Sequence, residues 1–329
     1  MDLSSVQPSA LQTFAAVVRS GSFTDAAREL GLSQSGVSQT VDRLERQLGL
    51  TLFDRSVRPL RVTAAGEEVF VLAERLVGES RFFADSVERI REGEVLSLRM
   101  GISEVAGSYA GPAIEAALIP ALKAFEGRTG LIPKMIDDFV AHRVDLVIAP
   151  DVPPEHRIAA HPLLRERYLI VAPKIPGVER DGLPLDALKP LRRLPFVSYV
   201  QQSLDWRKSL AMLRMLGLPS VSSIALENTA ALANAVVGGL GWTILPPMSL
   251  WCVRDRLGAV TLHGLDGLPA EKTLWAAVHS ARCRHLCDKA AEVFRREFRR
   301  SWLPQMKAAK PGIERYMKLL SDEDAATAA

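Results

Sequence analysis

Short and forked polar side chains recur along one stretch near the N-terminus of the sequence. An amide side chain can pair with the edge of adenine, a guanidinium with guanine or phosphate, and a hydroxyl with either a base or a phosphate. Few acidic residues interrupt the stretch, so its polar side suits the floor of a DNA major groove. The side chains expected to make these contacts are Ser33, Gln34, Ser35, Ser38, Gln39 and Arg43.

Two short helices joined by a tight turn must position these side chains. Ser22 and Ser33 are placed as N-caps, and Asp25 follows Ser22 as its partner in a capping box. An apolar stripe at helical spacing turns the polar side of the second helix outward. The pattern predicts a helix-turn-helix that reads DNA with its second helix, although a helical hairpin in any small bundle shares the two-helix pattern. The stripe consists of Val37, Val41, Leu44 and Leu48.

Arginines cluster directly after this pair of helices. Two short extended pieces, 51–53 and 60–63, are separated by a turn in which Pro59 disfavours a helix. A two-stranded wing with arginines can lie along phosphates or enter a minor groove. A solvated basic loop is the alternative, and Arg55 can instead pair with Asp54 or a helix carboxylate and hold the wing in place. The wing residues expected at DNA are Arg55, Arg58 and Arg61.

A long helix is expected after the wing, from about residue 64 to residue 92. Apolar and small residues recur along it in alternating steps of four and three, which is the heptad pattern of two helices side by side. An amphipathic helix lying on its own domain is the alternative. The strict spacing favours a dimer, and two-fold proteins read two half-sites of DNA. The heptad positions are Val69, Ala73, Leu76, Ser80, Phe83, Val87 and Ile90.

The pattern changes near Glu94, where strand-like and helix-like segments begin to alternate. Such alternation predicts βαβ units on a parallel sheet. Residues 121–125 are expected to form a strand and residues 126–129 its exit loop. The stretch 301–329 is polar at its end, is expected to be partly helical at best, and is assigned no role.

Strand ends in this arrangement face a cleft, where helix N-termini offer backbone N–H groups to an anionic ligand. Ser103 and Thr229 can equally serve as plain helix caps without a ligand. An inward-pointing Arg128 would favour an organic acid as the ligand, whereas an outward-pointing one would indicate nothing. The expected ligand-binding residues are Ser103, Arg128, Thr129, Ser198, Tyr199, Asn228 and Thr229.

Composition sets broad limits on the function. The chain has 329 residues and a formal net charge of +3, too small to indicate nucleic-acid binding by bulk charge. Its 3 cysteines form no disulfide framework and its first residues lack an apolar signal-peptide core, so a cytoplasmic location is expected. Residues 228–253 carry no charge, but their glycines and prolines favour a buried helix, turn and strand over a membrane span.

Residues for metal or enzyme chemistry are sparse in the sequence. One metal-like group combines two histidines and two cysteines without the spacing of a zinc site. No nucleophile–base pair and no Gly-rich phosphate loop is evident, so we predict no catalytic residue, metal site or cofactor. An enzyme that uses its N-terminal helices only to oligomerise, and a small-molecule binding protein of the transport kind, are the alternatives. The metal-like group is His279, Cys283, His285 and Cys287.

Several runs of residues resemble LysR-type transcriptional regulators. The N-terminal runs are long and specific, whereas two C-terminal runs agree more loosely. The runs are Phe14, 21–27 (GSFTDAA), 32–38 (LSQSGVS), 44–45, 48–49, 52–55 (LFDR), 60–66 (LRVTAAG), 144–148 (VDLVI) and 236–246 (VVGGLGWTILP).

The resemblance implies an α/β fold with an all-α winged helix-turn-helix domain, a long linker helix and a periplasmic-binding-protein-like effector domain of two α/β subdomains. It also implies homodimers, commonly assembled into homotetramers, that bind and bend double-stranded promoter DNA and act on transcription with RNA polymerase. A small-molecule effector in the cleft would modulate this binding. The predicted domains are the DNA-binding domain 1–63, the dimerisation helix 64–92, the effector-binding domain 93–300 (subdomain I about 94–161 and 266–300, subdomain II about 162–265) and a C-terminal extension 301–329.

Overall fold

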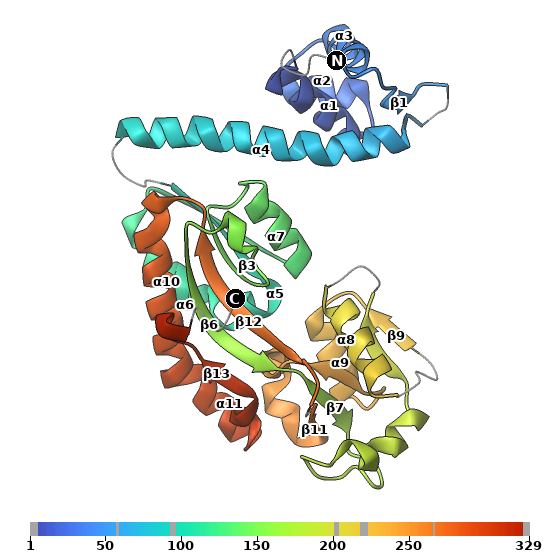
Figure 1. Cartoon of the computed structure of the whole chain (residues 1–329), viewed down its shortest axis with the longest axis vertical. Coiled ribbons are helices and arrows are strands. Elements are labelled where there is room, and N and C mark those ends of the chain that lie inside the picture. Colours follow the sequence, from blue (N-terminus) through green and yellow to red (C-terminus); the bar gives the residue numbers. More distant parts are fainter. Residues whose placement is uncertain are drawn as a thin grey trace. The chain divides into compact units, whose positions relative to one another are not determined.

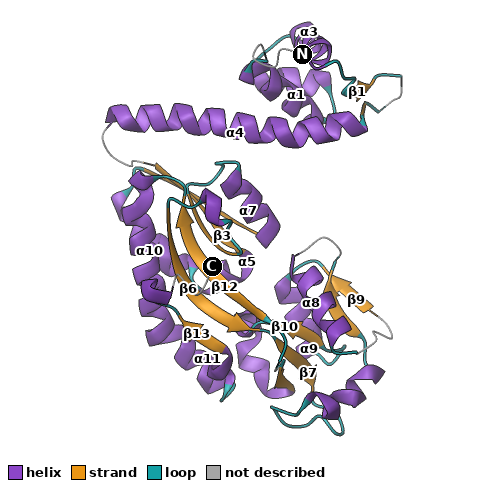
Figure 2. Cartoon of the chain, in the orientation of Figure 1, coloured by secondary structure: helices purple, strands orange, loops and turns teal. Residues whose placement is uncertain are grey.

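The structure is a computed structural model and describes residues 6–56, 59–92, 97–200, 204–217, 223–265 and 267–324. The chain forms two compact units, and each is described by itself (Figures 1 and 2). Among the helices in the described ranges, none is long and apolar enough to cross a membrane. Unit 1 is Met1–Glu94 with Val140–Arg143, and unit 2 is Val95–Phe139 with Val144–Ala329.

Local hydrogen bonds explain where the helices of unit 1 begin and end. The Ser22 hydroxyl accepts from the N–H of Asp25, and the Ser33 hydroxyl accepts from the N–H of Gly36. Gly31 ends the first of these helices in the left-handed conformation, with φ 66°. The predicted helix-turn-helix is therefore present. The elements are α1 (Pro8–Ser20), α2 (Phe23–Leu30), α3 (Gln34–Leu48), β1 (Phe53–Asp54), β2 (Arg61–Val62) and α4 (Ala64–Glu92).

An aromatic core joins the helices of unit 1 to the wing. The ring of Phe53 on β1 lies edge-on to the rings of Phe14 and Phe23, with both centroid distances at 5.5 Å. The wing strands pair antiparallel, with Phe53 opposite Val62. Burial of Phe53 therefore fixes the start of the wing against α1 and α2.

The larger sheet of unit 2 is mixed, which corrects the prediction of a parallel sheet. Its strand order is β13-β6-β12-β5-β3-β4, and only β3 pairs in parallel, with β4 and β5. Helices α6 and α10 pack together, and α10 also packs on β6 and β12. The elements around this sheet are β3 (Ser97–Ser103), α5 (Glu104–Tyr109), α6 (Gly111–Leu118), η2 (Ile119–Ala121), β4 (Ala124–Gly130), α7 (Ile132–Val140), β5 (Leu146–Pro150), η3 (Pro154–His156), β6 (Ala159–Arg167), β12 (Glu271–Val278), η6 (Ala281–Cys283) and α10 (Arg284–Glu297).

A second, smaller half of unit 2 lies between β6 and β12 in the sequence. It contains a three-stranded antiparallel sheet, β10-β7-β11, and a parallel pair, β8-β9. Where the chain crosses between the halves, the N–H of Tyr168 donates to the carbonyl of Ala270 at 2.7 Å. Its elements are β7 (Leu169–Pro173), η4 (Leu185–Arg193), β8 (Phe196–Tyr199), α8 (Leu204–Met215), β9 (Ser223–Leu226), α9 (Thr229–Val237), β10 (Thr243–Leu245), η5 (Pro247–Ala259) and β11 (Val260–Gly264).

The strand predicted at 121–125 and its exit loop at 126–129 are misplaced. Ile119–Ala121 is a short 3₁₀ helix, and the supposed loop residues lie within β4, paired in register with β3. β4 is an edge strand with mostly solvent-facing side chains, so its sequence is polar like that of a loop.

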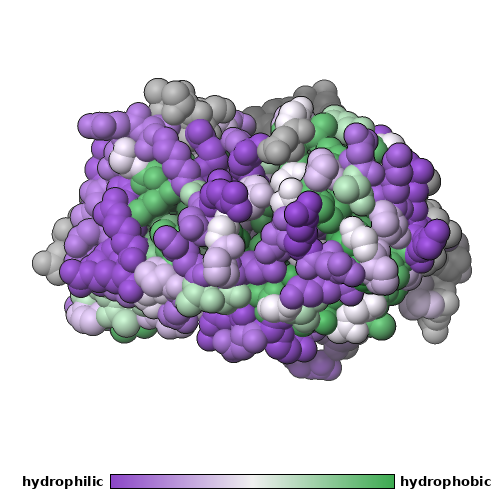
Figure 3. All heavy atoms as spheres, turned by 90° about the horizontal axis from the view of Figure 1, so that it is seen from below, coloured by the Kyte–Doolittle hydropathy of each residue, from purple (hydrophilic) through white to green (hydrophobic). Residues whose placement is uncertain are grey.

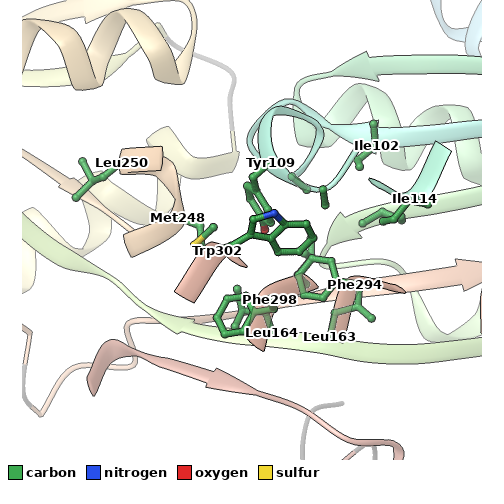
Figure 4. Packing of buried hydrophobic residues seen from close by; sticks show 14 of the residues in the cluster. Ile102, Tyr109, Ile114, Leu163, Leu164, Met248, Leu250, Phe294, Phe298 and Trp302 are labelled. Atoms are coloured by element: carbon green, nitrogen blue, oxygen red, sulfur yellow. The ribbon is translucent and has the colours of Figure 1, made fainter. Parts of the chain in front are cut away.

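The C-terminal stretch that was assigned no role packs onto the larger sheet. Trp302 is buried between Tyr109 and Phe294, with ring centroids 5.1 Å and 5.2 Å away (Figure 4). β13 then pairs antiparallel with β6, and Lys310 forms an ion pair with Asp181 at 2.9 Å. The elements are η7 (Phe298–Trp302), α11 (Leu303–Ala309), η8 (Ile313–Tyr316), β13 (Met317–Leu319) and η9 (Asp322–Asp324).

The surface seen from below is mostly hydrophilic, with smaller hydrophobic patches between the polar side chains (Figure 3). Such a mixture is ordinary for a folded domain in water.

Candidate nucleic-acid interface and ligand cavity

Helix α3 has one buried face and one open polar face. Val37, Val41 and Leu44 are fully buried against the rest of unit 1, and Leu48 is half-buried. The opposite face consists of hydrogen-bonding side chains that are mostly open to solvent. Ser33, Gln34, Ser35, Gln39 and Arg43 are exposed, and Ser38 is half-buried.

A hollow of about 610 Å³ lies beside this polar face. Residues from α2, α3 and the wing line it, including Thr24, Gln34, Ser38 and Pro59. The structure therefore brings the start of α2, the start of α3 and the wing around one concave surface.

Arg55 is held by carboxylates of α3, as in the alternative considered for this residue. Its guanidinium pairs with Asp42 and with Glu45, the latter at 3.3 Å, and also lies over the ring of Phe23. One guanidinium nitrogen reaches the hydroxyl of Ser38 at 3.5 Å. Arg55 thus ties the wing to α3.

Glu45 is a positioning residue that the sequence reasoning did not identify. Its Oε1 accepts from the backbone N–H groups of Leu52 and Phe53, at 2.6 and 3.2 Å, while Oε2 faces Arg55. The available signal was a glutamate in the last turn of the predicted second helix, six residues before the extended piece at 51–53. The side chain thus connects α3 to the backbone at the start of the wing and to Arg55.

The two other wing arginines differ in what the structure shows. Arg61 is exposed on β2 and stands opposite Asp54 in the strand pair. Hydrogen bonds from Ser56 lower the pKa of Asp54, and the positive charge of Arg61 lowers it further. Arg58 lies outside the described residues.

The predicted heptad of α4 divides into two parts. Ala73 is buried and Val69 half-buried within unit 1, whereas Leu76, Phe83 and Val87 are exposed, Phe83 by 70%. Ser80 is also exposed, and nothing is described for the side chain of Ile90. The exposed part, together with Leu72, forms an apolar stripe along α4.

A small cavity in unit 2 gathers three of the seven expected ligand-binding residues. Ser103 follows β3, Tyr199 ends β8, and Thr229 begins α9; all three line the cavity. The Tyr199 hydroxyl lies 2.8 Å from the Thr229 hydroxyl. The sequence reasoning missed two charged residues of the same lining, Glu104 and Lys272.

The other four expected residues are not among those that line the cavity. Arg128 pairs with Glu126 at 2.7 Å along β4, so its orientation gives no support for an acidic ligand. Thr129 is exposed on the same edge strand. The remaining two have local roles. Ser198 donates to the Tyr199 carbonyl, and Asn228 caps α9 by accepting from the N–H of Ala231.

Glu104 places a carboxylate at the N-terminus of α9. Burial raises the pKa of Glu104 above its usual value, while hydrogen bonds from the N–H groups of Thr229 and Ala230 oppose the rise. Because the N-terminus of a helix attracts negative charge, this contact joins the two halves of unit 2.

The metal-like group offers no metal site within the described ranges, where no three His, Cys, Asp or Glu residues are suitably placed. Nε2 of His279 lies 2.8 Å from the carbonyl of Val144. Cys283 and Cys287 are buried, and burial raises the pKa of Cys287 to about 12. A thiol with such a pKa stays protonated at neutral pH.

Both units match established family models. The model described as the bacterial regulatory helix-turn-helix protein, lysR family, matches residues 8–67, and the LysR substrate binding domain matches residues 91–302. The chain belongs to the LysR family of bacterial transcriptional regulators. This LysR-type protein is accordingly a DNA-binding transcriptional regulator with an effector-binding domain, and the predicted fold class and function are confirmed.

LysR-type relatives match over most of this chain. HTH-type transcriptional regulator CfxR of Cupriavidus necator is 27% identical over 304 residues, 88% of this chain and 93% of CfxR. A full-length OxyR variant from Pseudomonas aeruginosa has a TM-score of 0.58 at 17% identity, with coverage of 88% of this chain and 97% of its own. CbnR complexed with its target DNA has a TM-score of 0.55 at 16% identity, with coverage of 88% and 99%. At such identities the two structures show the shared fold.

Proposed function

We propose that this LysR-type regulator reads double-stranded promoter DNA with the polar face of α3, while its wing follows the adjacent backbone. The observation that carries the proposal is the division of α3 into a fully buried Val37–Val41–Leu44 side and an open polar side. CbnR, which shares the fold, has been solved with its target DNA. The proposed base-reading and phosphate-binding residues are Ser33, Gln34, Ser35, Ser38, Gln39, Arg43, Arg58 and Arg61.

Arg55 has a different part in this proposal. Its pairing with Asp42 and Glu45 leaves it to orient the wing, so it acts on DNA through the position of its neighbours. Arg61 is the described wing residue placed to approach a phosphate, because its side chain is exposed on β2.

The test is binding to the DNA upstream of the protein's own gene, measured by fluorescence anisotropy across a range of salt. Specific affinity should fall about tenfold or more in Gln39→Ala, because one amide–base pair is lost. Arg61→Ala should weaken binding to all DNA sequences alike. It should also reduce by about one the magnitude of the slope of log binding constant against log salt concentration. Gln7→Ala, which removes an exposed amide just before α1, is the matched control. Absence of any sequence preference at every salt concentration would refute the proposal.

We propose that α4 joins two copies of the chain through its apolar stripe, defined above as Leu72, Leu76, Phe83 and Val87. These side chains are exposed in the single chain, and the spacing fits a pair of helices side by side. Two such dimers would form the homotetramer. Promoter bending, contact with RNA polymerase and a cytoplasmic location are proposed from family membership alone.

We propose that the effector, a small organic acid in the broad sense, binds in the cavity lined by Ser103, Tyr199 and Thr229. These residues come from both halves of unit 2, so a ligand that contacts them all is sensitive to the relative position of the halves. Differential binding to two arrangements is what lets an effector alter DNA binding.

A further inference from the structure

Two buried residues of the effector cavity carry donor groups for which the described residues supply no hydrogen bond or ion pair. Ser103 is 4% exposed and Lys272 is 8% exposed, and both line the cavity. Within the described ranges neither side chain makes a hydrogen bond or an ion pair. The Lys272 ammonium has the ring of Tyr168 near it, 5.8 Å from Nζ to the centroid. The Lys272 ammonium and the Ser103 hydroxyl are both donors that line this cavity, so together they suit an anionic group of a ligand.

A carboxylate of the protein stands across the sheet from Lys272. Glu166 stands opposite Lys272 in the β6–β12 register, but its Oε1 accepts from the backbone N–H of Met248 at 2.7 Å.

A negative charge of the protein lines the same cavity. Glu104 accepts hydrogen bonds from the N–H groups at the start of α9. These N–H groups would otherwise be available to the anionic end of a ligand. A carboxylate has more acceptor positions than these two N–H groups use. Glu104 can therefore accept from a cationic group of a ligand while it remains on α9.

We propose that this cavity binds a small α-amino acid as a zwitterion, an inference that rests on the effector site proposed above. The ligand carboxylate accepts from Nζ of Lys272 and the hydroxyl of Ser103, and the ligand ammonium donates to Glu104. A carboxylic acid without an amino group would accept hydrogen bonds from Lys272 and Ser103. It would have no cationic group to pair with the carboxylate of Glu104.

The cavity volume links this ligand to movement of the halves. The cavity measures about 30 Å³, room for about two water molecules. An amino acid is larger than that, so we expect its binding to move the halves apart around the crossover at Tyr168 and Ala270. Binding would thereby favour a more open arrangement of the effector domain.

The test uses the full chain and a thermal-shift panel of the twenty L-amino acids, each at about 10 mM, since a ligand of the folded state raises the melting temperature. The amino acid with the largest shift is then titrated beside its 2-hydroxy acid and its decarboxylated amine. We expect each of these analogues to bind at least tenfold more weakly. In Glu104→Gln the preference should reverse, with the 2-hydroxy acid binding better than the amino acid.

Lys272→Met should weaken binding of the amino acid at least tenfold, whereas the exposed control variants Lys174→Met and Glu179→Gln should leave this affinity unchanged. If Lys272→Met does not fold, the Glu104→Gln reversal carries the test. The inference is overturned if no amino acid shifts the melting temperature, or if the 2-hydroxy acid binds the wild-type chain as tightly. DNA binding measured on the same samples separates the two proposals, because a regulator that binds its promoter without any amino acid response refutes this inference alone.

Discussion

Replacing Glu45 tests whether one carboxylate sets the position of the wing. In Glu45→Ala, the N–H groups of Leu52 and Phe53 lose their acceptor and Arg55 loses one of its two carboxylates. The Glu45 side chain is only 16% exposed, so water replaces these bonds poorly. Hydrogen bonds to a charged group contribute about 1.5–3 kcal/mol each, and two of them suggest a loss of about 3 kcal/mol.

The loss should be local, because the buried core of unit 1 is untouched. Amide hydrogen exchange reports it directly: protection at Leu52 and Phe53 should fall about 100-fold for a change of that size. Glu45→Gln keeps an acceptor oxygen, so protection at Leu52 and Phe53 should fall less than in Glu45→Ala. Glu68→Ala, which removes an exposed carboxylate of α4, is the control. Unchanged protection at Leu52 and Phe53 in Glu45→Ala would show that the wing is held by other contacts.

Three further predictions follow from the contacts described above. Arg55→Ala and Asp42→Ala should weaken promoter binding to a similar degree. Because the two residues act as a pair, the double variant should bind the promoter only slightly more weakly than either single variant. A larger loss of affinity in the double variant would indicate a direct DNA contact by Arg55. Burial lowers the pKa of His263 to about 4, an effect that Asp181 opposes and Lys310 strengthens. Below about pH 6.5 the unfolded chain binds a proton that the folded chain excludes. The free energy of unfolding of unit 2 should therefore be highest above about pH 6.5 and fall by roughly 2–3 kcal/mol as the pH approaches 4. All 5 tryptophans lie in unit 2, so their fluorescence in urea measures this loss, and His263→Asn should flatten the pH dependence. Phe83→Glu should dissociate the dimer in sedimentation, whereas Val71→Glu, a similarly exposed position off the apolar stripe, should not; dissociation in both would place the interface elsewhere.

The helix-turn-helix could be predicted because its signals are local. Ser22 and Ser33 cap helices within their own neighbourhood, and the spacing of Val37, Val41 and Leu44 alone determines which face is buried. Short-range hydrogen bonds and helical periodicity do not depend on the rest of the chain.

The sheet and the effector cavity could be predicted only in part, because they depend on residues far apart in the sequence. β6 and β12 pair antiparallel because the chain leaves the larger half after β6 and returns to it at β12. No local sequence pattern indicates this connection. Glu104 and Lys272 meet only once the two halves are folded, and each alone looks like an ordinary surface charge. Arg128 was expected in a loop, but it lies in β4, because an edge strand and a loop have similar polar compositions.

The pairing of β13 with β6 has a practical consequence for producing this protein. Residues 303–324 lie beyond the matched effector domain, so a shortened gene ending at residue 302 would look reasonable. Such a fragment would leave the β6 backbone edge open along Leu164 and Glu166, ready to recruit strands from other molecules. We therefore expect this fragment to aggregate during purification.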